Sequence, residues 1–198
     1  SGAYCGWLGC ASRPVGRTSR QQCRRIRRGE RFLMANPPKQ KGTKFETATV
    51  RYLRWAVQDE RIDRMALHGT NDTGDITGVL FWGHKVCVEC KDTKKPDYAA
   101  HYSELVDEMS HLDTEYGVLV QHRKGLGLEH MDGQMAIMSR DMLDRFTAPF
   151  ATSPVPEVVQ TMAEPLNVKG PRLVWIPLRL FAFLLNDLLP LGPDENEV

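Results

Sequence analysis

The alternation of apolar and polar positions along the chain predicts an α/β protein. Apolar residues recur at helical spacing in two stretches and at strand spacing, or as short unbroken apolar runs, in four others. The expected order is helix, three strands, helix, strand, over residues 43–58, 64–68, 75–81, 85–91, 98–112 and 116–121. Elements in this order are typical of an α/β core built on a mixed sheet.

The start of the first helix is expected at Thr43. Pro37 and Pro38 are expected to exclude helix, and residues 39–42 form a basic lead-in. Thr43 and Glu46 have the spacing of a capping box, in which each side chain bonds a free main-chain N–H at the helix start.

The C-terminal part is expected to add a strand and a helix to this core. A strand at 135–138 and a helix at 140–146 come first, and a Pro-punctuated connection at 148–172 follows. The strand 173–176 then leads into an apolar helix at 178–189. The whole apolar stretch, 173–189, is too short and too interrupted to span a bilayer. A helix apolar nearly all round is buried, either against its own domain or in a homodimer. An acidic tail closes the chain at 193–198.

The charge distribution separates an N-terminal arm from the rest. The net charge of the 198 residues is only +1, but residues 1–33 hold eight Arg, no Lys and one acid, which leaves 18 basic and 24 acidic residues after them. An arm of this kind resembles a transit peptide, a basic clamp for nucleic acid, or translated upstream sequence ahead of Met34. We favour the third interpretation, and we divide the chain into an unstructured arm at 1–33, a core at 34–147 and additions at 148–198.

The five cysteines indicate a reducing compartment. Their number is odd and their spacing irregular, which disfavours a secreted disulfide scaffold and favours the cytoplasm. Cys87 and Cys90 are three residues apart on an expected strand, so they face opposite sides of it and make a poor zinc knuckle.

Charged residues gather at one edge of the expected sheet. In the strand 85–91, Glu89 and Lys91 share a face, and Asp75 begins the strand that pairs with it. On the first helix, Glu46 lies within the apolar arc, where an isolated carboxylate is costly. A divalent cation would satisfy the three carboxylates, and oxygen ligands favour Mg²⁺ or Mn²⁺ over zinc. The alternative is a salt-bridged cluster in which Lys91 pairs with Glu89 and Glu46 only caps its helix.

These residues also resemble a known motif. Gly74-Asp75-Ile76 followed by Glu89-Cys90-Lys91, with thirteen residues between Asp75 and Glu89, resembles the signature of PD-(D/E)XK nucleases. Residues 41–46 (Lys-Gly-Thr-Lys-Phe-Glu) resemble the first-helix motif of archaeal and phage-type Holliday junction resolvases. The resemblance covers residues 39 to about 123, and it departs from the usual pattern in having Gly rather than Pro before Asp75.

The resemblance implies a restriction-endonuclease-like core and a set of site residues. Asp75, Glu89 and the main-chain carbonyl of Cys90 would hold Mg²⁺, or Mn²⁺ in its place, and Glu46 would bind it directly or through water. Lys91 would orient the attacking water, help to deprotonate it and stabilise charge on the phosphate. Contacts to the DNA backbone are expected from Lys41, Lys44, His68, Thr70, Lys94, Lys95, Arg123 and Lys124.

The expected function is therefore that of a Mg²⁺-dependent DNA endonuclease most like a Holliday junction resolvase, acting on branched DNA in a bacterial or phage-infected cytoplasm. One alternative is a restriction-like or repair nuclease on another DNA structure. A second is a DNA-binding relative without catalysis. A small-molecule enzyme is disfavoured because no phosphate-cradling glycine loop or nucleophile motif is present.

Overall fold

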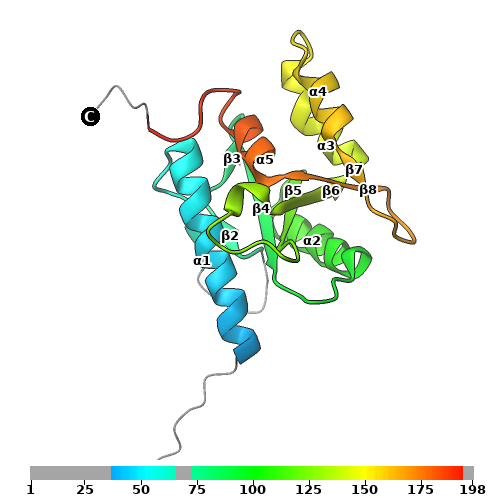
Figure 1. Cartoon of the computed structure of the whole chain (residues 1–198). Helices are drawn as coiled ribbons and strands as arrows, with labels where there is room; N and C mark the ends of the chain where they lie inside the picture. Colours follow the sequence, from blue (N-terminus) through cyan, green and yellow to red (C-terminus); the bar gives the residue numbers. More distant parts are fainter. Residues whose placement is uncertain (1–36, 66–72, 194–198) are drawn as a thin grey trace, which may run out of the picture. The chain divides into compact units, whose positions relative to one another are not determined.

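The fold is built on a mixed, mostly antiparallel open sheet with five α-helices around it (Figure 1). The computed structural model describes residues 37–65 and 73–193. Their elements are, in order, α1 (Pro37–Val57), β1 (Asp63–Arg64), β2 (Ile76–Thr77), β3 (Leu80–Phe81), β4 (His84–Lys91), α2 (Tyr98–Leu112), β5 (Tyr116–Gln121), the 3₁₀ turn η2 (Met131–Gly133), β6 (Met135–Ser139), α3 (Arg140–Thr147), the 3₁₀ turn η3 (Ala148–Phe150), α4 (Val155–Met162), β7 (Glu164–Pro165), β8 (Leu173–Pro177) and α5 (Leu178–Leu185).

The sheet runs in the order β1-β2-β4-β5-β6-β8-β7, and β3 pairs separately with β4 as a hairpin. Only β4 and β5 are parallel, and α2 makes the crossover between them. Their register aligns Val88 with Val118 and Lys91 with Gln121, so both strands end at the same edge. The α/β class with a mixed sheet is confirmed.

Helices cover the two faces of this sheet. On one face, Phe45 and Leu53 of α1 and Phe181 of α5 pack with Val88 of β4, and Figure 1 shows α1 and α5 next to each other. On the other face, Leu105 of α2 packs with buried residues of β4, β5 and β6. The edge where β4 and β5 end therefore lies between α1 and α2.

The first helix begins six residues earlier than the sequence predicted. It starts at Pro37, because proline is tolerated in a first turn, where the main-chain N–H groups have no helical partner. Thr43 lies inside the helix, and its carbonyl accepts a hydrogen bond of 2.8 Å from the Thr47 hydroxyl. The predicted start at Thr43 and the capping box with Glu46 are wrong.

The central elements follow the prediction closely, and the connections do not. The helix at 98–112 and the strand at 116–121 are confirmed. The strand predicted at 75–81 breaks at Gly78, which has φ of 83° and on which a Cβ would stand 2.2 Å from the Arg61 carbonyl oxygen. Of the strand predicted at 64–68, only the start is seen, as β1, and residues 66–68 lie outside the described part.

The C-terminal part contains more structure than expected. The connection predicted at 148–172 holds α4 and β7, while α5 ends at Leu185 rather than at residue 189. Asp187 and Leu188 have φ of 52° and 65°, which ends the helix. Within the described residues, no helix has the length and apolar character needed to cross a membrane.

Candidate active site

Asp75 is held at the sheet edge by main-chain hydrogen bonds. It directly precedes β2, and its own N–H donates to the Val88 carbonyl at 2.9 Å. Its carboxylate accepts a hydrogen bond of 2.9 Å from the N–H of Cys90. Gly74 before it has φ of 95°, and a Cβ there would stand 3.0 Å from the Val88 oxygen. Glycine at position 74 thus permits the close approach that carries Asp75 to β4.

Glu89 and Lys91 lie beside Asp75 on the α2 face of β4. Glu89 is 5 % exposed, and its Oε1 is 2.6 Å from Nζ of Lys91. The same Nζ is 3.0 Å from Oε2 of Glu104 on α2. The alternation predicted for this strand is confirmed, since Cys90 packs in the α1 cluster and Cys87 in the α2 cluster. The two thiols face apart, and burial raises the pKa of Cys90.

Burial and neighbouring acids raise the pKa values of both Asp75 and Glu89. Burial, together with the charges of Asp75 and Glu108, raises the pKa of Glu89 to about 9 despite its bond to Lys91. Burial also raises the pKa of Asp75, against the effect of the Cys90 N–H, and the charge of Glu46 adds to the increase. A site with this charge pattern takes up a proton at neutral pH unless another cation is present.

Lys91 keeps its positive charge in these surroundings. Burial alone would lower its pKa, but the hydrogen bonds and charges of Glu89 and Glu104 outweigh burial and raise it. The ammonium group is therefore charged over the whole physiological range and stays at the edge of the carboxyl pair.

Glu46 reaches the same region from α1 but has a different partner. Its carboxylate is 17 % exposed and binds Arg64 of β1, with Nη2 and Nε at 2.5 Å and 2.9 Å from Oε2. Within the described residues, no three acidic, His or Cys side chains stand close enough together to hold a metal ion. The structure thus brings Asp75, Glu89 and Lys91 together and turns Glu46 toward Arg64. Metal binding by the predicted set stays a prediction.

The residues predicted to contact DNA differ in their exposure and in their partners. Lys44, Lys94, Lys95 and Lys124 are exposed. Lys41 pairs instead with Asp92, and Arg123 stacks over the Trp175 ring, 5.0 Å from its centre. His68 and Thr70 lie outside the described residues.

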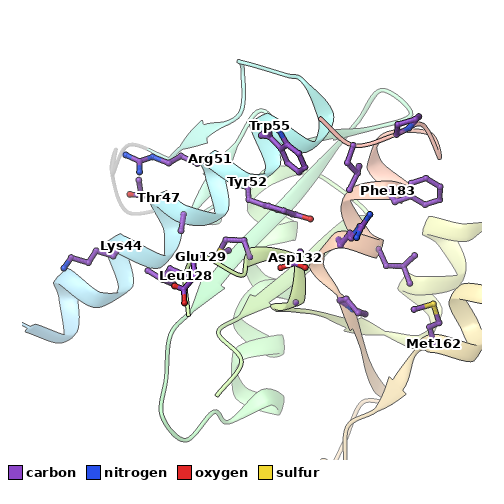
Figure 2. Close-up of a pocket in the computed structure, with 18 of the residues that line it drawn as sticks. Lys44, Thr47, Arg51, Tyr52, Trp55, Leu128, Glu129, Asp132, Met162 and Phe183 are labelled. Atoms are coloured by element: carbon purple, nitrogen blue, oxygen red, sulfur yellow. The ribbon is translucent and has the colours of Figure 1, made fainter. Parts of the chain in front are cut away.

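A large groove runs along α1 and was not predicted from the sequence. It encloses about 1570 Å³ between α1, the segment 128–133 and α5 (Figure 2). Figure 2 shows Tyr52 reaching from α1 toward Asp132 across the groove. Its lining mixes aromatic, cationic and apolar side chains, among them Lys44, Arg51, Tyr52, Trp55, Arg179 and Phe183.

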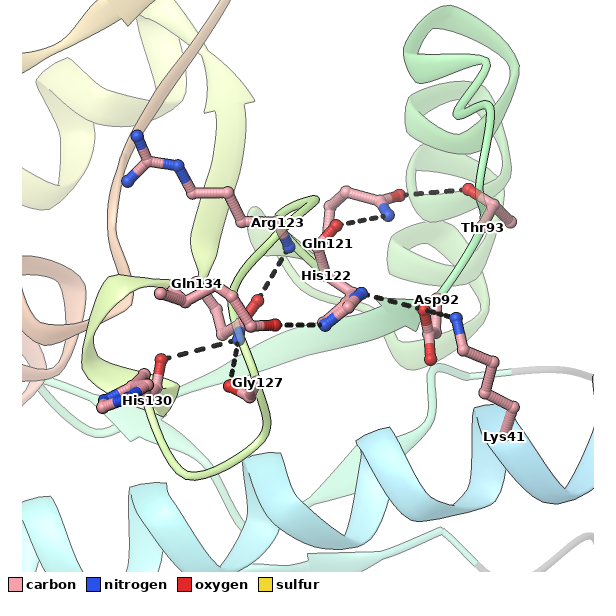
Figure 3. Close-up of polar contacts among 10 residues, drawn as sticks. Lys41, Asp92, Thr93, Gln121, His122, Arg123, Gly127, His130 and Gln134 are labelled. Atoms are coloured by element: carbon pink, nitrogen blue, oxygen red, sulfur yellow. Dashed lines mark hydrogen bonds and ion pairs between the residues drawn. The ribbon is translucent and has the colours of Figure 1, made fainter.

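A polar network braces the strand ends next to the site (Figure 3). Asp92, whose side chain is 3 % exposed, pairs with Lys41 at 2.5 Å and with Nδ1 of His122 at 3.0 Å. The other ring nitrogen of His122 lies 2.7 Å from the Leu126 carbonyl oxygen. Gln134 accepts from the Arg123 N–H at 2.7 Å, which fixes the loop after β5. The signal in the sequence was a polar residue directly after each of two adjacent strands, Asp92 and His122.

Comparison with known proteins returned no relatives: no family model, no curated protein and no solved structure matches this chain.

Proposed function

We propose that this protein is a metal-dependent DNA endonuclease that hydrolyses phosphodiester bonds, with a four-way junction as the first candidate substrate. The observation that carries the proposal is the meeting of two buried carboxyls, Asp75 and Glu89, beside the ammonium group of Lys91. Perturbed acids next to a cation at a sheet edge are typical of catalytic sites.

The order of elements supports a restriction-endonuclease-like core. Helix α1 precedes the antiparallel strands β1, β2 and β4, and α2 then leads to β5, parallel to β4. This is the helix, three strands, helix and strand that the resemblance to PD-(D/E)XK nucleases implies. Asp75 directly precedes β2, and Glu89 lies on β4, with which β2 pairs.

The donor set fits a small divalent cation. Asp75 and Glu89 offer carboxylate oxygens, and Mg²⁺ in proteins usually takes one or two carboxylates and leaves its other positions to water and phosphate. Burial and the charges of neighbouring acids raise their pKa values, and the positive charge of such a cation would offset both effects. Mn²⁺ is expected to replace it. When bound, the metal would lower the pKa of a water molecule and offset charge on the phosphate.

The chain's own groups then have separate roles. The Cys90 N–H fixes one oxygen of Asp75, so its carboxylate keeps its direction. Lys91 is held by Glu89 and by the half-exposed Glu104, and it can exchange Glu104 for a phosphate oxygen without leaving Glu89. Glu46 would act through water, or directly after release from Arg64.

A cleavage assay tests this proposal. Purified protein is incubated with a four-way junction, a flap and a linear duplex, each with Mg²⁺, with Mn²⁺ and with EDTA. We expect metal-dependent cutting, fastest on the junction, and its loss in Asp75→Asn. Faster cutting of the flap would favour the repair-nuclease alternative. DNA binding without cutting in any metal would favour a non-catalytic DNA-binding protein.

The matched control is Asp97→Asn. Asp97 caps α2 through the Ala100 N–H and lies after the candidate site in the chain. Loss of activity in both variants would point to a general effect on the fold rather than to a metal ligand.

A further inference from the structure

The groove along α1 is larger than a small molecule needs. Its volume of about 1570 Å³ exceeds the usual range for small-ligand sites, roughly 300–1,000 Å³. Its walls come from α1, the segment 128–133, α5 and the chain after α5. An open groove of this size is suited to a chain-like ligand.

The groove offers ring faces and uncommitted cations. Trp55 is 48 % exposed, and the Tyr52 ring lies 5.9 Å from it. The Tyr52 hydroxyl is buried and has no hydrogen-bond partner within the described residues. The cations of the lining are Lys44, Arg51 and Arg179. None of them has a hydrogen bond or an ion pair with another described residue.

The acidic residues of the lining lie opposite α1. Glu129 and Asp132 come from the segment 128–133, whereas Lys44 and Arg51 come from α1. A polyanion in the groove would therefore place its charges along α1 and its uncharged groups toward the other wall. Carboxylates can also accept hydrogen bonds from the amino groups of bases.

We propose that this groove binds a single-stranded segment of DNA, with phosphates along Lys44 and Arg51 and a base stacked on Trp55. Aromatic faces beside cations are the recurrent means of holding single strands. A peptide without acidic side chains would use the apolar lining but would leave these cations without partners. The proposal rests on the proposed function in one respect, since the single-stranded segment would belong to the DNA on which the candidate site acts.

The lining of the groove includes none of Glu46, Asp75, Glu89 and Lys91, so the groove is a separate surface from the candidate site. It begins at Thr43 and Lys44, within one helical turn of Glu46, and extends to Trp55. With a rise of about 1.5 Å per residue, α1 spans roughly 18 Å over this length.

Binding is tested in EDTA, where no cutting occurs, with the full chain and a fluorescently labelled oligothymidylate. We expect Trp55→Leu to weaken binding about five-fold or more, the effect of losing one stacked base. The matched control is Trp82→Leu, since Trp82 is 60 % exposed on the β3–β4 turn, outside the groove. Melting curves of both variants exclude a folding defect.

The salt dependence of oligothymidylate binding gives a second measurement, made with substitutions of exposed lysines. Each phosphate contact to a single strand contributes about −0.7 to the slope of log K against log salt. Lys44→Gln should reduce the slope by about that amount. Lys85→Gln, an exposed lysine at the start of β4, should leave the slope unchanged.

Three results would overturn the proposal: equal binding by the Trp55 and Trp82 variants, a salt slope unaffected by Lys44→Gln, or self-association that Trp55→Leu abolishes without any oligothymidylate binding. The last would assign the groove to a second copy of the chain. Nuclease activity is scored separately with Mg²⁺, so cutting without single-strand binding refutes only the groove, and binding without cutting refutes only the nuclease.

Discussion

Replacing Glu89 by Gln tests two effects of this carboxyl: the stability that its ionisation costs the folded protein, and the Mg²⁺ binding that it would provide. Its pKa rises from 4.5 to about 9 in the folded protein, because burial and the charge of Asp75 disfavour the anion. The folded state therefore binds more protons than the unfolded state between these two pH values. The stability that proton uptake gives is fully present below pH 4.5 and is lost as pH rises toward 9.

The magnitude follows from the linkage relation. One proton changes the free energy of unfolding by at most about 1.4 kcal/mol per pH unit, so Glu89 costs the metal-free protein up to about 3 kcal/mol between pH 4.5 and pH 7. Gln does not titrate and removes this dependence. We expect Glu89→Gln to gain stability over wild type as pH rises through this range, measured by urea denaturation in EDTA.

The control variant, Glu104→Gln, should show the opposite pH dependence of stability relative to wild type. Glu104 binds the same lysine, but its hydrogen bond to Lys91 lowers its pKa. Its contribution is present above its unfolded pKa and lost on acidification, so Glu104→Gln should lose stability relative to wild type as pH rises.

Mg²⁺ at about 100 times its dissociation constant should add about 2.7 kcal/mol to the free energy of unfolding of wild type and much less to that of Glu89→Gln. A pH dependence shared by wild type and Glu89→Gln, or equal stabilisation of both by Mg²⁺, would refute the reasoning.

Three further substitutions test the surroundings of Glu89. Asp75→Asn should abolish cleavage yet leave DNA binding intact or tighter in a gel-shift assay, because it removes negative charge facing phosphate; near wild-type cutting would exclude Asp75 as a ligand. Glu46→Gln should weaken the use of Mg²⁺, with part of the rate recovered at high Mg²⁺ or in Mn²⁺, and an unchanged metal titration would leave Glu46 as the partner of Arg64 only. Asp92→Asn should lower the free energy of unfolding by roughly 2 kcal/mol in urea, because it weakens the buried pairing with Lys41 and His122; a loss below about 0.5 kcal/mol would mean that the brace is not structural.

Local patterns predicted the parts of the fold that depend on local physics. The periodicity of residues 98–112 and the apolar run at 116–121 are enough to define α2 and β5. Alternation along β4 placed Glu89 and Lys91 on one face, and the structure has them there. The break at Gly78 could not be foreseen, because it depends on the carbonyl of Arg61, which lies far from it in the sequence.

The partners of the charged residues were harder to predict than their positions. Glu46 lies in the apolar arc as expected, but whether it meets Arg64 or a metal depends on where β1 packs against α1. The pairing of Asp92 with His122 needs the parallel register of β4 and β5, which no local pattern contains. The groove likewise depends on how α5 and the segment 128–133 pack around α1.

The charge balance around Lys91 bears on the two interpretations that the sequence left open. A salt-bridged cluster accounts for the contact of Lys91 with Glu89 and Glu104. It does not account for Asp75, whose carboxyl has the Cys90 N–H and the Glu89 side chain as hydrogen-bond partners but no cation within ion-pair distance among the described residues. Buried carboxylates in excess of their cations must be protonated or bind a further cation. Protons and Mg²⁺ should therefore compete for this site, and the metal affinity should fall as pH is lowered through the titration of Glu89.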